Sequence, residues 1–189
     1  MAANPLFLRF PDHFETGRLL VRAPRAGDGP AVNQAVRESF EELRPWMPWA
    51  RFMPSLAESE TFAREGAAKF RVRDELPLLL FRKTDNLIVG ASGMHHIDWD
   101  VPRLEIGYWV RTSLQGQGYI TEAVLGITGF AFQTLKAERL EIRCDARNTR
   151  SAAVAQRAGF ALEACFRHER RDTEGQLADT LVYARLRGE

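Results

Sequence analysis

Hydrophobic residues along the chain gather into short runs separated by turn-forming residues. The runs are rich in β-branched and aromatic side chains and are bounded by Gly, Pro, Asn or Asp, a pattern typical of β-strands. Asp85 and Asn86 between two such runs favour a hairpin turn. The pattern predicts strands at residues 18–23, 76–82, 87–97, 104–110, 140–144, 161–166 and 177–186.

Other segments repeat their apolar positions at the spacing of a helix. The clearest repeat follows Gly118 and consists of Ile120, Val124, Ile127, Ala131 and Leu135. Further helices are predicted at residues 31–40, where Asp28 would be the N-cap, 58–73 and 150–157. Residues 44–49 should interrupt the first of these, because prolines at 45 and 48 lack amide donors.

The order of these elements predicts the fold class. Strands that follow one another closely form an antiparallel meander, whereas residues 104–110 and 140–144 are joined by a helix and should therefore be parallel. We expect a mixed α/β (α+β) fold in one domain, residues 1–189, with residues 1–14 as an N-terminal extension.

Charge and composition exclude several classes of function. The 26 Lys and Arg are balanced by 25 Asp and Glu, so neither a nucleic-acid partner nor a membrane surface is expected. Cys144 and Cys165 match neither a disulfide framework nor a zinc pattern. The first residues lack the pattern of a signal peptide, and we expect a cytoplasmic protein.

Glycines mark the junction between the strand at 104–110 and the helix that follows. The first amides of a helix have no intrahelical acceptor, and the helix dipole adds positive potential, so such a junction can hold phosphate. A nucleotide P-loop would need Lys and Ser or Thr after the glycines, whereas Tyr119 and Ile120 follow here. The match to a dinucleotide fingerprint is also poor, because the third glycine is absent. A glycine turn without a ligand remains the alternative.

Several segments together resemble the GNAT superfamily of N-acetyltransferases and, within it, the RimJ/RimL-like enzymes that modify ribosomal proteins. The strongest are Leu104-Glu105-Ile106-Gly107-Tyr108-Trp109-Val110 and Gly116-Gln117-Gly118-Tyr119-Ile120-Thr121-Glu122-Ala123. Residues 16–22, 44–49, 148–151 and 159–160 also match, so the resemblance extends over residues 14–186.

The resemblance implies that acetyl-CoA is the co-substrate. By the same resemblance, the two parallel strands would splay apart and admit the pantetheine arm of acetyl-CoA between them. Asn148 would form a hydrogen bond with that arm. The backbone near Tyr108, Trp109 and Val110 would polarise the thioester carbonyl. The pyrophosphate would lie on the backbone of Gln115, Gly116, Gln117, Gly118, Tyr119, Ile120 and Thr121. Ile120 departs from the superfamily pattern of Gly or Ala, so either the loop stands further from the phosphates or this side chain points into the core.

Acid–base roles are also implied by the resemblance. Glu105 is the leading base, with a raised pKa expected in a cleft, and Glu169 is the second candidate; each could instead be a structural charge. The superfamily's tyrosine acid would fall at Ala155, which leaves Ser151 as the candidate acid, with a helix cap as the alternative.

The acceptor pocket is expected to involve Trp46, Met47, Trp49 and Cys144, although core packing is a competing interpretation for each. His95 and His96 suggest a metal, yet neighbouring residues of a strand point to opposite faces, so we assign no metal.

We therefore expect direct acetyl transfer to a primary amine within a ternary complex, most simply the N-terminal α-amine of a ribosomal protein. A small amine such as a polyamine or aminoglycoside, and a catalytically silent CoA-binding module, are the alternatives. The resemblance also allows a homodimer.

Overall fold

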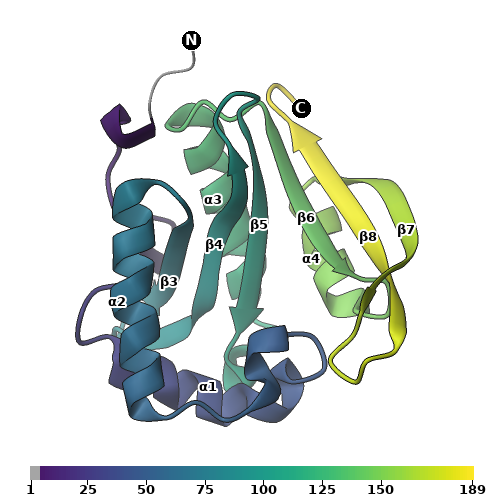
Figure 1. Ribbon diagram of the computed structural model, residues 1–189. Helices are drawn as coiled ribbons and strands as arrows, with labels where there is room; N and C mark the ends of the chain where they lie inside the picture. Colours follow the sequence, from purple (N-terminus) through teal and green to yellow (C-terminus); the bar gives the residue numbers. More distant parts are fainter. Residues whose placement is uncertain (1–4) are drawn as a thin grey trace.

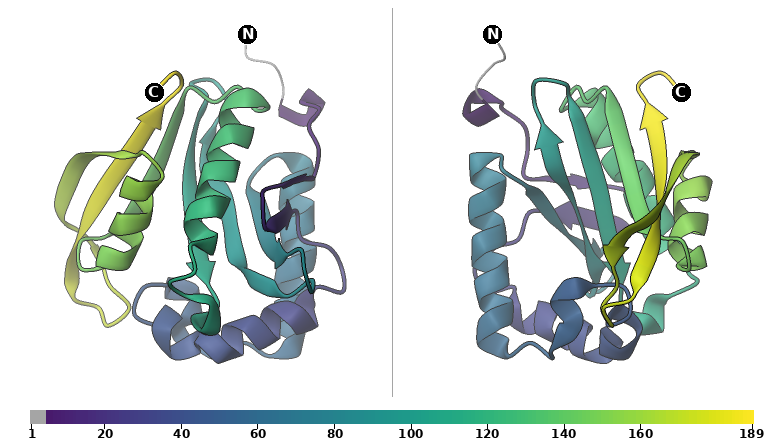
Figure 2. Two further views of the ribbon diagram at one scale, coloured as in Figure 1. Left: turned by 180° about the vertical axis from the view of Figure 1, so that it is seen from behind. Right: turned by 45° about the vertical axis from the view of Figure 1, so that its right-hand side comes forward.

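The computed structural model describes residues 5–189, in which one mixed sheet carries helices on both of its faces (Figures 1 and 2). The strands are β1 (His13–Glu15), β2 (Leu19–Arg22), β3 (Leu76–Arg82), β4 (Ile88–Asp98), β5 (Arg103–Val110), β6 (Arg139–Asp145), β7 (Ala161–Arg171) and β8 (Leu177–Leu186). Their order in the sheet is β1-β2-β3-β4-β5-β6-β8-β7. β5 and β6 are parallel and the other pairs are antiparallel, so the predicted fold class is confirmed.

Helices cover the two faces unequally. α3 (Tyr119–Gln133) and α4 (Thr149–Arg157) lie behind the sheet in Figure 1, and α2 (Leu56–Val72) lies in front of its N-terminal strands. α1 (Gly29–Leu43) runs below the sheet. The short 3-10 segments η1, η2 and η3 are Pro5–Phe7, Pro48–Arg51 and Thr112–Leu114. Among the described residues, no helix is long and apolar enough to cross a bilayer.

α3 anchors the core, as its sequence predicts. Four residues of its apolar stripe, Ile120, Val124, Ile127 and Ala131, and Leu135 just after the helix are each no more than 7% exposed and belong to one cluster with side chains from β2 to β6. Burial of such side chains supplies roughly 1.5–3 kcal/mol each, which holds the start of α3 at a defined place against β5.

Several boundaries differ from the sequence prediction. β1 was not predicted, because a strand of three residues carries too little pattern to detect, and its His13 and Phe14 fall within the predicted extension. α2 begins at Leu56 rather than at residue 58, because Ser55 and Glu58 form a capping box. Residues 1–4 of the extension lie outside the described residues.

The first helix also begins differently from the prediction. Asp28 stands at the N-cap of α1 but makes no side-chain cap bond. Its carboxylate instead accepts two hydrogen bonds from Arg22, at 2.6 and 2.8 Å. α1 ends at Leu43, so the predicted interruption by the proline-containing segment is confirmed.

Candidate active site

A cavity of about 880 Å³ opens where β5 and β6 separate. The two strands pair only from Arg103–Glu105 to Arg139–Glu141, and further along they diverge (Figure 1). The volume lies within the range of small-molecule and cofactor sites. The cavity is lined by Glu42, Leu43, Pro45, Trp46, Met47, Tyr108, Trp109, Val110, Leu114, Gln115, Gly116, Gly118, Tyr119, Ile120, Thr121, Asn148, Thr149, Arg150, Ser151, Ala153, Val154 and Arg157.

The glycine loop before α3 forms one wall of this cavity. Gly116 and Gly118 have φ values of 73° and 78°, a left-handed conformation that side chains disfavour. Gly118 is the N-cap of α3, so the first amides of that helix lack intrahelical acceptors, and its first three residues line the cavity. The loop therefore has the backbone form of an anion site.

Arg18 on the segment before β2 holds this loop from outside. Its guanidinium donates to the Gln117 carbonyl at 3.0 Å and lies 4.3 Å from the centre of the Tyr119 ring. Glu122, in the first turn of α3, accepts hydrogen bonds from the Arg18 amide at 2.7 Å and from its Nε at 2.6 Å. Glu122 also accepts a hydrogen bond from the Thr16 hydroxyl, at 2.6 Å. This network fixes the loop relative to the sheet.

Gln117 differs from its neighbours in the loop, because it does not line the cavity. Its side chain donates to the Ser113 carbonyl at 3.2 Å, and its own carbonyl accepts from Arg18. Ile120 is 7% exposed and packs in the core, which agrees with its place on the helical stripe.

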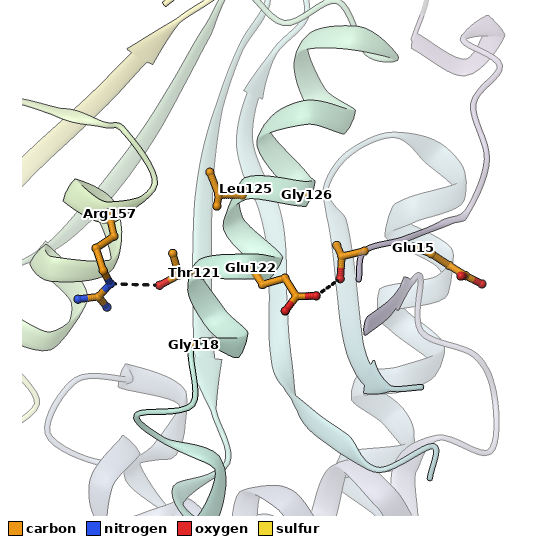
Figure 3. A pocket seen from close by; sticks show the side chains of 8 residues that line it. Glu15, Gly118, Thr121, Glu122, Leu125, Gly126 and Arg157 are labelled. Carbon is orange, nitrogen blue, oxygen red and sulfur yellow. Dashed lines mark hydrogen bonds between the residues drawn. The ribbon is translucent and has the colours of Figure 1, made fainter. Parts of the chain in front are cut away.

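Two arginines of α4 line the cavity and were not predicted. Arg150 donates to Gln115 Oε1 at 2.9 Å, and Arg157 donates to Thr121 Oγ1 at 3.3 Å (Figure 3). Both therefore place positive charge beside the glycine loop. The available signal was their spacing of seven residues, which puts them on one face of a helix.

Tyr108 and Ser151 meet across the cavity. The Tyr108 hydroxyl lies 3.0 Å from Ser151 Oγ and donates to the Ser151 carbonyl, also at 3.0 Å. Burial raises the pKa of Tyr108 further above its usual range, so the phenol stays protonated at neutral pH. The superfamily's tyrosine would fall at position 155, where this chain has a buried alanine, whereas the Tyr108 hydroxyl reaches Ser151 from β5.

Asn148, not Ser151, is the N-cap of α4. Its side-chain oxygen accepts from the Ser151 amide at 3.0 Å, so that oxygen is engaged within the helix. The Ser151 hydroxyl is therefore not a capping group and faces Tyr108. Trp109 and Val110 line the cavity beside Tyr108.

Of the predicted acceptor residues, Trp46 and Met47 line the cavity and two others do not. Trp49 is 50% exposed and packs on Trp109, with ring centres 6.2 Å apart. Cys144 belongs to the core, where burial raises the pKa of its thiol. It is not among the residues that line the cavity, but its thiol contacts Ser151, which does line it, so a place for Cys144 at the acceptor pocket stays a prediction.

Glu105 is not among the residues that line the cavity. Its carboxylate accepts from His95 Nε2 at 3.2 Å and from His96 Nδ1 at 2.9 Å. Burial is the largest single influence and raises its pKa, but the two histidine contacts together outweigh burial and leave the pKa below its usual value. The expected raised pKa is therefore wrong.

The expectation that His95 and His96 point to opposite faces is also wrong. His96 has a φ of 48°, and the register of β4 with β5 shifts between His95 and Asp98. This bulge interrupts the alternation of a regular strand and turns both rings toward Glu105.

Glu169, the second candidate base, does not line the cavity either. Its carboxylate binds Arg143 on the neighbouring strand β6. Burial raises the pKa of Glu169, but the neighbouring Thr180 hydroxyl and the hydrogen bond and charge of Arg143 outweigh burial and leave that pKa below its usual value. Neither candidate carboxylate thus has the raised pKa that suits a general base.

Taken together, a sheet with one splayed parallel pair, a glycine loop at a helix start and flanking arginines define a transferase that binds coenzyme A. Comparison with known proteins makes the class definite. The model of the acetyltransferase (GNAT) domain matches residues 18–161, and the chain belongs to this family, in its RimJ/RimL-like subgroup. It is an acetyl-CoA-dependent N-acetyltransferase.

Individual relatives support this assignment. The chain is 30% identical over 146 residues to the ribosomal-protein-serine acetyltransferase of Escherichia coli (strain K12), covering 76% of this chain and 80% of that protein. It is 31% identical over 147 residues to YdaF of Bacillus subtilis (strain 168), with 77% and 79% covered. A solved structure of RimL, a ribosomal alpha-N-protein acetyltransferase in complex with coenzyme A, superposes with a TM-score of 0.84 at 25% identity, covering 90% of this chain and 95% of that one.

Proposed function

We propose that the acetyl acceptor is the N-terminal α-amine of a protein, and that a ribosomal protein is the natural substrate. The observation that carries this proposal is the similarity to a ribosomal-protein-serine acetyltransferase over 76% of the chain. The proposed reaction forms a bond between the amine nitrogen and the acetyl carbon and breaks the carbon–sulfur bond of acetyl-CoA.

The lowered pKa values of the two candidate bases favour an α-amine over a lysine side chain as acceptor. An acceptor must lose a proton before it attacks, and the two candidate bases, Glu105 and Glu169, have pKa values below the usual range. A protein α-amine titrates near 7.7–8.0, whereas lysine titrates near 10.4. At neutral pH the α-amine therefore presents a free-base fraction larger by a factor on the order of one hundred, with no strong base required.

The departing sulfur needs a hydrogen-bond donor, and we assign this role to Tyr108 and Ser151. Both line the cavity, and their hydroxyls lie 3.0 Å apart, so a proton donated by one can be replaced through the other. The positive charges of Arg150 and Arg157 would bind the phosphates of the cofactor beside the glycine loop.

The test uses a panel of acceptors with acetyl-CoA and follows the release of free thiol. The panel contains a ribosomal-protein N-terminal peptide, the same peptide with its α-amine blocked but its lysines free, a polyamine and an aminoglycoside. We expect turnover on the first peptide alone, with the acetyl group located on the α-amine by mass spectrometry. Equal turnover on the blocked peptide, or turnover on the small amines alone, would overturn the proposal.

A further inference from the structure

A cluster of possible metal ligands lies at the far end of β5 from the glycine loop and consists of His95, His96 and Glu105. One potential ligand atom from each residue lies within 4.8 Å of the others. Each imidazole contacts a different oxygen of the same carboxylate, at 3.2 and 2.9 Å. The three groups therefore lie within 4.8 Å of one another and come from two neighbouring strands.

Three departures from a regular strand produce this convergence. His96 has a φ of 48°, a conformation that is costly for a residue other than glycine. The strand register shifts just after His95. Across the ladder stands Gly107, where an added Cβ would lie only 2.9 Å from His95 Cε1, so a glycine is needed for this ring position.

We propose that His95 Nε2, His96 Nδ1 and the Glu105 carboxylate form a binding site for a divalent transition-metal ion, with Zn²⁺ as the best match. Two imidazoles and one carboxylate are a ligand set that zinc commonly takes, with bonds of about 2.0–2.2 Å. In a tetrahedral site such bonds place neighbouring ligand atoms about 3.4 Å apart. The observed contacts of 2.9 and 3.2 Å are close to that separation.

Burial divides the cluster into a fixed part and a movable part. The Glu105 side chain is 16% exposed and His95 is 33% exposed, whereas His96 is 77% exposed. The first two are held by the sheet, and the His96 ring can adjust to close around an ion. Because the His96 side of the site faces solvent, water can occupy the fourth coordination position of the ion, as in zinc sites with three protein ligands.

Metal binding is measured directly, without reference to catalysis. The metal-stripped protein is titrated with ZnCl₂ by calorimetry, and the bound metal is counted after dialysis. We expect one equivalent of zinc and a rise in melting temperature. His96→Gln and Glu105→Gln should each weaken binding by about tenfold or more, because each removes one of the three protein ligands. His168→Gln, which changes an exposed histidine elsewhere, is the matched control and should bind zinc normally.

Cobalt identifies the ligands. Co²⁺ bound at this site should show ligand-field bands without the intense sulfur charge-transfer band that a cysteine ligand produces. The melting temperature of each variant in EDTA establishes that it is folded. Absence of binding by the wild-type protein, unchanged binding in both ligand variants, or loss of binding in Cys165→Ser would each overturn the proposal.

Discussion

The Tyr108 hydroxyl lies 3.0 Å from Ser151 Oγ and joins the end of β5 to the first turn of α4 across the gap in the sheet. This contact brings together residues that are 43 positions apart in the sequence. It occurs because the start of α4 is fixed by Asn148, whose side chain caps the helix and leaves the Ser151 hydroxyl turned toward the cavity.

Removal of either hydroxyl should slow the reaction without greatly weakening cofactor binding. Tyr108→Phe and Ser151→Ala are each expected to lower kcat by about 10- to 100-fold, because a donor to the leaving sulfur acts mainly in the transition state. The KM for acetyl-CoA should change by about threefold at most. Steady-state kinetics measures both quantities.

Ser55→Ala is the control for these two variants. It removes the N-cap of α2, away from the cavity, and should cost about 1 kcal/mol of stability with an unchanged kcat. A kcat loss of the same size in this variant would show that the effect reflects stability and not the leaving group.

Gly118→Ala should weaken the binding of acetyl-CoA. The residue has a φ of 78° at the start of α3, and a side chain there costs roughly 1–2 kcal/mol, which the loop can relieve only by moving its amides. We expect the dissociation constant of coenzyme A to rise by about tenfold. Gly175→Ala, at a φ of 83° in the turn between β7 and β8, carries the same backbone strain and should bind normally. Equal losses in the two variants would contradict a phosphate-binding role for this loop.

Arg157→Ala should raise the KM for acetyl-CoA, with a larger effect at low ionic strength. Its guanidinium lies beside the glycine loop through Thr121, and a phosphate contact there is screened by salt. The expected change is about fivefold at low salt and smaller at 0.5 M salt. Arg64→Ala, on the surface of α2, is the charge-matched control. An equal change of the KM for acetyl-CoA in the two variants would contradict a phosphate-binding role for Arg157.

Asp145→Asn should destabilise the protein more at neutral pH than in acid. Arg147 and Arg170 bind this buried carboxylate, and hydrogen bonds from Arg147 are the main reason that its pKa is lowered. A lowered folded pKa contributes stability that is complete above the unfolded value, near 3.9, and is lost as the pH falls through the folded value. The variant should lose about 2–3 kcal/mol at pH 7, a difference that narrows below about pH 4.

Urea unfolding at the two pH values measures this difference. Asp85→Asn alters an exposed pair with Arg82 and should leave the stability nearly unchanged at either pH. If the loss of stability in Asp145→Asn is the same at both pH values, it does not arise from the charge of the Asp145 carboxylate.

The rate of acetyl transfer should follow the titration of the acceptor. With no raised carboxylate pKa at Glu105 or Glu169, kcat/KM is expected to rise with pH and level off near pH 8, the range of a peptide α-amine. A peptide whose N-terminal residue lowers that pKa should shift the profile to lower pH by the same amount. A profile that stays in place when the acceptor changes would assign the titration to an enzyme group.

The sequence was sufficient for much of the fold and of the cofactor loop. Strong apolar periodicity located α3, and turn chemistry gave the bounds of β3 and β8 as the structure has them. Two elements were not predicted correctly. β1 was missed because it is too short, and the end of β7 was missed because that strand contains a register shift. The single-domain organisation, the homodimer and the cytoplasmic location stay predictions.

The sequence by itself indicated the class of protein, through several segments that together resemble one family, and it located the glycine loop, because glycines at a strand-to-helix junction are a local signal. Only the tertiary structure decided which side chains meet. Tyr108 reaches Ser151 because β5 and β6 diverge, and both histidines reach Glu105 because one residue adopts a positive φ. Such contacts depend on strand separation and on single backbone angles, and neither is encoded in the spacing of apolar residues.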